Sequence, residues 1–92
     1  MEFVFTEQSP LRGRECRVSP GDTVGREGCD HELVDPEVSR RHAAFRQAEG
    51  GLAIEDLGST NGTFVNERRV TGVGVLAPGD RLRFGNTVWL LE

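Results

Sequence analysis

The chain has 92 residues and a formal net charge of −4, and 36% of its residues are hydrophobic. This length fits one domain with a thin core, and the apolar content is too high for a disordered chain. A negative chain lacks the basic face of a general nucleic-acid binder. The apolar runs are too short to cross a bilayer, and the first residues do not resemble a secretory signal. We expect one cytoplasmic domain, residues 1–92, with no nucleic-acid or membrane partner.

The pattern of apolar residues predicts short strands along the chain. Phe3–Phe5 opens it with an apolar run, and Val88–Leu91 closes it with another. Between these ends, apolar and polar residues alternate with period 2 over segments too short for helices: Glu15–Val18, Leu52–Glu55 and Arg81–Phe84. Pro, Gly, Asn and Asp mark turns between the segments. The sequence therefore predicts an all-β sandwich or barrel whose two terminal strands pair.

The segment after residue 34 has two interpretations from local rules. Asp35–Glu37 has the residue types of a helix start, with Pro at the first helical position. Three apolar or aromatic residues then follow at helical spacing: Val38, His42 and Phe45. One interpretation is a helix over 36–48. The other is a loop to about Arg40 followed by a strand over Arg41–Gln47, and local rules give the two equal weight.

Catalytic and metal chemistry find little support in the sequence. Ser39, His42 and Asp56 are the residue types of a hydrolase triad, but the Gly-x-Ser-x-Gly elbow is absent. The potential zinc ligands match no zinc-site spacing: Cys16, Cys29, His31 and His42. The Gly58–Gly62 segment lacks the Lys of a nucleotide-binding loop. We predict no catalytic residues, no metal and no cofactor, and hence no enzyme.

Three segments far apart in the sequence carry residue types that can bind an anion. Arg26 follows a Gly at a predicted strand end, Ser39 offers a hydroxyl beside two arginines, and Ser59–Gly62 offers hydroxyls, an amide and backbone N–H groups. A phosphate dianion needs several charge-assisted donors at once. Loops at one end of a rigid sandwich are where binding residues usually lie. These residues therefore predict an anion site.

The full motifs resemble those of the forkhead-associated (FHA) domain, from about Gly21 to Leu91. They occur in the family's order: Val24–Arg26, Ser39–Ala43, Asp56–Asn66 and Leu76–Leu82. The resemblance implies an antiparallel FHA/SMAD-like β-sandwich of about eleven strands, whose loops hold an extended phosphothreonine peptide. It also decides between the two interpretations of 36–48, in favour of loop followed by strand.

The resemblance also implies roles for individual residues. Arg26, Ser39 and Arg40 would contact the phosphate, and Thr60 would add a hydroxyl or backbone contact. Asn61 would bond the peptide backbone beside the phosphothreonine and fix its register.

Four further residues would support the site or tune its specificity. Gly25 and Gly62 would permit backbone shapes that a Cβ would block, and His42 would brace the binding loop. Glu37 precedes Ser39 by two residues, where the family reads the third peptide residue after the phosphothreonine. An acid there indicates a preference for Arg or Lys at that peptide position.

Some residues depart from the family pattern or have a simpler interpretation. Glu67 stands where a turn Gly is common, so we expect a different turn there. His31 replaces an apolar strand residue, and we expect it to be partly exposed or paired with a neighbour. Arg41 and Arg68–Arg69 are interpreted as solvated charges.

The function that the resemblance implies is a phosphothreonine-dependent interaction module. Its partner would be a phosphothreonine-containing protein or peptide, and the phosphate would come from a Ser/Thr protein kinase. The alternative is an interaction or dimerisation module of the same fold that acts without phosphate.

Overall fold

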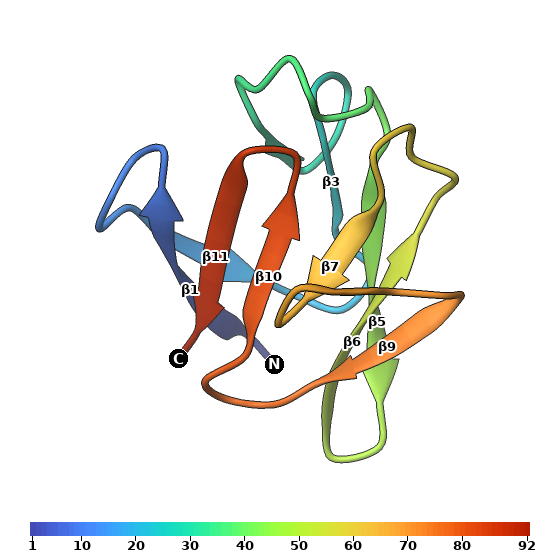
Figure 1. The fold of residues 1–92 in the computed structure, drawn as a ribbon. Coiled ribbons are helices and arrows are strands. Elements are labelled where there is room, and N and C mark those ends of the chain that lie inside the picture. Colours follow the sequence, from blue (N-terminus) through green and yellow to red (C-terminus); the bar gives the residue numbers. More distant parts are fainter.

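The computed structural model describes residues 1–92 as two packed β-sheets without a helix (Figure 1). No membrane-spanning helix is present. The first sheet has the strand order β2-β1-β11-β10-β7-β8: β1 (Phe3–Ser9), β2 (Glu15–Val18), β7 (Thr63–Val65), β8 (Arg68–Arg69), β10 (Arg81–Phe84) and β11 (Thr87–Leu91). The second has the order β4-β3-β5-β6-β9: β3 (Thr23–Gly25), β4 (His31–Glu32), β5 (Ala43–Ala48), β6 (Gly51–Asp56) and β9 (Val73–Leu76). The predicted all-β, eleven-stranded sandwich is confirmed.

One pair of strands is not antiparallel. β3 and β4 run parallel, with Val24 opposite His31. The Asp30 carboxylate accepts hydrogen bonds from the backbone N–H and the hydroxyl of Thr23, at 2.9 and 3.2 Å. Asp30, the last residue before β4, is thereby held beside Thr23, the first residue of β3. The short β3–β4 loop can therefore connect two parallel strands.

The core lies between the sheets and is centred on aromatic rings. Phe5, Phe45, Phe84 and Trp89 are each at most 1% exposed. Phe5 lies 5.6 Å from the rings of both Phe45 and Trp89, so it joins the two sheets. The predicted alternation explains this burial, because side chains of a strand point to opposite faces. In β2, for example, Cys16 is buried and the Glu15 beside it is exposed.

The strands at the two ends of the chain pair as predicted. β1 runs antiparallel to β11, with Phe5 opposite Leu91. Both termini therefore lie together in the lower part of Figure 1, whereas the β3–β4, β4–β5 and β6–β7 loops and the β10–β11 turn lie at the upper end. The fold thus gathers four connections from distant parts of the sequence at one end of the sandwich.

The segment 36–48 is a loop followed by a strand, so the helical interpretation is wrong. Asp35 begins a single turn, because its side chain accepts the Glu37 N–H and its carbonyl accepts the Val38 N–H, both at 3.0 Å. The turn ends there because the next N–H, of Ser39, is bonded to the His42 ring. β5 then begins at Ala43, two residues later than predicted, and its pairing with β6 buries Phe45.

The two departures from the family pattern have simple structural forms. Asn66 and Glu67 both have positive φ, 51° and 65°, as the two central residues of a tight β-hairpin require. Glu67 adopts this shape without a glycine, and its carboxylate pairs with Arg83 at 3.0 Å. The His31 side chain is 17% exposed and contacts the Asp22 carboxylate at 2.9 Å, so the expected pairing is confirmed.

Candidate functional site

The candidate site is built on the close approach of β3 to the β4–β5 loop. A Cβ on Gly25 would lie 2.1 Å from the carbonyl oxygen of Arg40 and 2.9 Å from the sulfur of Cys29. No side chain fits in that space, so glycine allows the two segments to touch. This contact places Arg26, the next residue, beside the loop that carries Ser39.

The Nε of Arg26 is hydrogen-bonded, whereas the terminal nitrogens of its guanidinium are not. Its backbone N–H donates to the Ser39 carbonyl, and its Nε donates to the Val38 carbonyl, both at 3.0 Å. The two terminal nitrogens of the guanidinium make no hydrogen bond, and the residue is exposed. The guanidinium is therefore oriented in advance and retains the donors that bind phosphate in a forked geometry.

Ser39 connects the β4–β5 loop to the β6–β7 loop. Its Oγ accepts the backbone N–H of Thr60 at 3.0 Å. Its own N–H donates to Nδ1 of His42 at 3.1 Å, and Nε2 of His42 contacts the Gly62 carbonyl at 2.8 Å. Since Nδ1 accepts, Nε2 carries the proton and donates, which makes the ring neutral. The fully buried His42 thus bridges the two loops; the resemblance stated above implies that it braces the binding loop.

Asp56, at the end of β6, organises the β6–β7 loop. One carboxylate oxygen accepts the hydroxyls of Ser59 and Thr63, at 2.5 and 2.7 Å, and the other accepts the N–H groups of Gly58 and Ser59. Burial raises the pKa of Asp56, but these hydrogen bonds lower it by more, so its pKa lies below its ordinary value. The ionised carboxylate therefore holds the loop that presents Thr60.

A second carboxylate, Asp35, fixes the β4–β5 loop against the β10–β11 turn. It accepts the Glu37 N–H, the Asn86 N–H at 2.9 Å and the Thr87 hydroxyl at 2.8 Å. Burial raises its pKa, and hydrogen bonds from these three residues bring it below its ordinary value. Gly85 completes the contact, because a Cβ there would lie 2.9 Å from the Cβ of Glu37.

Asn61 and Glu37 hold each other across the site. The Asn61 side-chain amide donates to the Glu37 carbonyl at 2.8 Å and to its carboxylate at 3.0 Å. Both residues are exposed. Asn61, which the resemblance implies would bind the peptide backbone, is therefore bonded to Glu37, which would contact the third peptide residue after the phosphothreonine.

These loops surround a hollow of about 290 Å³. Its lining includes most of the predicted site residues: Arg26, Glu37, Ser39, Thr60 and Asn61. Arg40 does not line the hollow; it is exposed beside Ser39, and its carbonyl accepts the Glu27 N–H. The three support residues Gly25, His42 and Gly62 lie behind the lining and are buried.

Four arginines on or near these loops are not paired with a carboxylate. Arg26, Arg40, Arg41 and Arg69 form no salt bridge, whereas Arg17, Arg46 and Arg83 do. The guanidinium of Arg69 lies beside Gly62, since a Cβ there would be 3.1 Å from its Cζ. The sequence predicts a solvated side chain for Arg69, and only the fold brings it to the β6–β7 loop.

The geometry does not form a hydrolase triad. Both ring nitrogens of His42 are bonded to backbone groups, and neither contacts the Ser39 hydroxyl. Asp56 bonds Ser59 and Thr63 rather than the imidazole. A triad needs the base bonded to the nucleophile and the acid bonded to the base, so Ser39, His42 and Asp56 do not form one.

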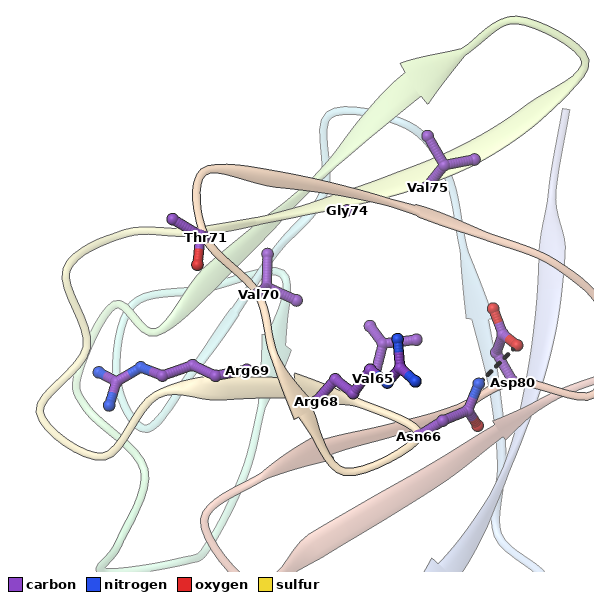
Figure 2. A pocket seen from close by; sticks show the side chains of 9 residues that line it. All are labelled: Val65, Asn66, Arg68, Arg69, Val70, Thr71, Gly74, Val75 and Asp80. Carbon is purple, nitrogen blue, oxygen red and sulfur yellow. Dashed lines mark hydrogen bonds between the residues drawn. The ribbon is translucent and has the colours of Figure 1, made fainter.

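The largest hollow, about 660 Å³, lies elsewhere, between the β7–β8 hairpin and β9 (Figure 2). Arg68 and Arg69 line it together with Val65, Val70 and Val75. Asn66 and Asp80 at its side already bond each other at 2.9 Å. It shares no residue with the hollow at the loops, so its size does not make it the anion site.

Sequence reasoning missed the two carboxylates that hold the site together. The sequence pattern indicates only a possible triad acid for Asp56 and a helix start for Asp35. An Asp at the start of a turn can accept the backbone N–H groups that follow it, as in an Asx-turn. That signal was present for Asp56; the partners of Asp35 at 86 and 87 were not readable from local sequence.

A family model described as FHA domain matches residues 23–85, and the chain therefore belongs to the FHA domain family. It is 45% identical over 67 residues to the oxoglutarate dehydrogenase inhibitor of Corynebacterium diphtheriae, which covers 72% of this chain and 46% of that relative. The chain thus spans about half the length of this curated relative.

Solved FHA domains share the whole fold. One, from a structural and functional analysis of phosphothreonine-dependent FHA domain interactions, is 31% identical, with a TM-score of 0.87 over 100% of this chain and 96% of that one. The FhaA FHA domain, complexed with an intracellular domain of another protein, is 32% identical, with a TM-score of 0.86 over 98% of this chain and 99% of that one.

Proposed function

We propose that residues 1–92 form one non-enzymatic unit that binds phosphothreonine segments of partner proteins. The observation that carries this proposal is the hollow at the loops, where the oriented Arg26 guanidinium faces the Ser39 and Thr60 segments. The similar domain in the study of phosphothreonine-dependent interactions supports the choice of ligand. A Ser/Thr protein kinase would supply the phosphate, and the domain would act in the cytoplasm.

The mechanism is capture of a doubly charged group by several donors. Phosphorylation adds about −1.5 to −2 charges and three acceptor oxygens to the threonine. Arg26, Ser39, Arg40 and Thr60 would bond these oxygens, and Asn61 would bond the peptide backbone. Each hydrogen bond to a charged group is worth about 1.5–3 kcal/mol net. Three or four such bonds supply about 5–12 kcal/mol before the cost of ordering the peptide, and micromolar affinity, about −8 kcal/mol, needs a value near the top of that range.

Asn61 must exchange partners for this mechanism to operate. In the free domain its amide is bonded to Glu37. A peptide backbone carbonyl would replace that bond, and the Glu37 carboxylate would then be available to a basic peptide residue. Peptide register and sequence preference are thereby set by the same pair of residues.

The test is a fluorescence-anisotropy titration with degenerate phosphothreonine peptides, alongside unphosphorylated and phosphoserine versions. We expect binding of the phosphothreonine peptides, no detectable binding without phosphate, and phosphoserine binding weaker by at least about fourfold, the value of one buried methyl. Arg26→Ala should abolish binding. Arg46→Ala is the matched control, because Arg46 is exposed on β5 and pairs with Glu55 at 2.8 Å.

The rival function is a phosphate-independent interaction module of the same fold. Equal binding of phosphorylated and unphosphorylated peptides, or unchanged affinity in Arg26→Ala, would favour that rival and contradict the proposal. Circular dichroism of each variant shows whether a loss of binding is a loss of fold.

A further inference from the structure

A second surface adjoins the hollow at the loops. A neighbouring hollow of about 350 Å³ shares Arg26 and Pro36 with it and is otherwise lined by residues 32–35. A third, of about 240 Å³, shares Leu33 and Val34 with the second and extends to Pro10 and Leu11 on the β1–β2 loop. The three hollows therefore adjoin one another in a row, a path that starts at the candidate anion site.

Four exposed residues along this path are apolar, and they lie among charged residues such as Glu32 and Arg14. Val34 is 101% exposed and Leu11 is 57% exposed, and Pro10 and Pro36 are exposed on either side of them. We call these four residues the apolar strip. Exposed valines occur elsewhere, on β9, but the strip alone is continuous with the candidate site.

The fold holds Val34 outward between two buried anchors. Leu33 is 4% exposed, and its N–H donates to the Gly25 carbonyl at 2.8 Å. Asp35 is also 4% exposed and accepts hydrogen bonds from Glu37, Asn86 and Thr87. Because both neighbours are fixed, the Val34 side chain is presented to solvent at a defined place, which lowers the ordering cost of a contact with it.

We propose that the apolar strip binds an apolar side chain of the same phosphorylated segment, so that the domain selects partners with an aliphatic or aromatic residue near the phosphothreonine. This inference rests on the proposed phosphothreonine site. Continuity of the strip with that site, through Arg26 and Pro36, makes a flanking residue of the bound segment its occupant. A peptide anchored by phosphate pays most of its ordering cost at the anion site, so a further apolar contact adds directly to affinity.

The test is a leucine scan across a phosphothreonine peptide with alanine at all other positions. An extended chain advances about 3.3 Å per residue, so about five positions on each side cover the strip. Each peptide is titrated into the unaltered protein and into Val34→Ser and Leu11→Ser. We expect at least one leucine position to raise affinity about fivefold, the value of a partly buried side chain, and Val34→Ser to remove that gain.

Val73→Ser is the matched control, because Val73 is a 55%-exposed valine on β9 that lines none of these hollows. No gain at any leucine position, or a gain that survives in both strip variants, would overturn the inference. So would concentration-dependent dimerisation lost in Val34→Ser without any change in peptide affinity. Failure of the all-alanine phosphopeptide to bind would instead contradict the proposed phosphothreonine site, so the two failures are distinguishable.

Discussion

The Ser39 hydroxyl accepts the backbone N–H of Thr60 at 3.0 Å, across 21 residues of sequence. This bond joins the β4–β5 loop to the β6–β7 loop at the hollow where we place the phosphate. Ser39 can therefore act twice, since it holds Thr60 in place and its hydroxyl hydrogen can point to an anion.

Ser39→Ala should weaken binding of a phosphothreonine peptide by about tenfold or more and change the free energy of unfolding by only about 0.5–1.5 kcal/mol. Peptide titration and urea unfolding measure the two effects. Ser19→Ala is the control, because Ser19 lies in a turn and its hydroxyl makes no hydrogen bond. A Ser39→Ala protein with unchanged affinity would contradict the role given to this hydroxyl.

Gly25→Ala should destabilise the protein by at least about 2 kcal/mol and abolish peptide binding, because the new Cβ would overlap the Arg40 carbonyl oxygen. Chemical denaturation followed by Trp89 fluorescence measures the loss. In Gly51→Ala the Cβ meets no atom within 4 Å, and we expect a change within about 0.5 kcal/mol. Equal stabilities of the two variants would show that β3 and the loop do not approach as described.

Asp56→Asn should lower the free energy of unfolding by about 1–3 kcal/mol at neutral pH. The pKa of Asp56 is depressed in the folded state, so its contribution is complete above the unfolded pKa of about 3.9 and is lost as pH falls through the folded pKa. The difference in stability between the natural protein and Asp56→Asn should therefore narrow below about pH 4. Unfolding curves at a series of pH values test this, and a difference independent of pH would contradict it.

Glu67→Gly should be more stable than Glu67→Ala by about 1 kcal/mol. Both changes remove the ion pair with Arg83, but only glycine relieves the left-handed backbone at φ 65°. Because both variants lack the ion pair, its small contribution to the free energy of unfolding cancels when the two are compared. Thermal unfolding gives the difference, and equal melting temperatures would mean that the turn carries no strain.

Glu37→Gln should retain phosphothreonine binding and lose the preference for Arg or Lys at the third peptide residue after it. The carboxylate charge provides that preference, whereas the bond from Asn61 to the Glu37 carbonyl does not depend on it. We expect the ratio of affinities for Lys and Ala peptides to fall from about fivefold to near one, as for a partly exposed ion pair. An unchanged ratio would exclude Glu37 as the residue that reads this position.

Much of the fold was predictable from the chain because short alternating segments and turn residues act locally. The alternation of Glu15–Val18 and the pairing of the two terminal strands both follow from this pattern. The segment 36–48 was not decided by local rules, since its helix-start residues serve a different purpose. Asp35 caps one turn and then bonds the β10–β11 turn, which is a tertiary contact.

The candidate site was predictable in its residues but not in its connections. The order of the motifs predicts that Arg26, Ser39 and Asn61 belong to one site, and all three line one hollow. The groups that these residues contact could not be predicted from the sequence. The bond from Arg26 to the Val38 carbonyl and the approach of Arg69 to Gly62 depend on how loops pack, which no spacing in the sequence specifies.

The pairing of β1 with β11 has a practical consequence for how the domain is handled. Because both ends emerge away from the loops that carry Arg26 and Ser39, a fluorophore, affinity tag or surface attachment at either end leaves those loops facing solution (Figure 1). A biosensor chip loaded through a terminal tag would display every copy with its loops outward. Fusing a second domain at one end would likewise leave room for a large phosphorylated protein at the other side of the sandwich.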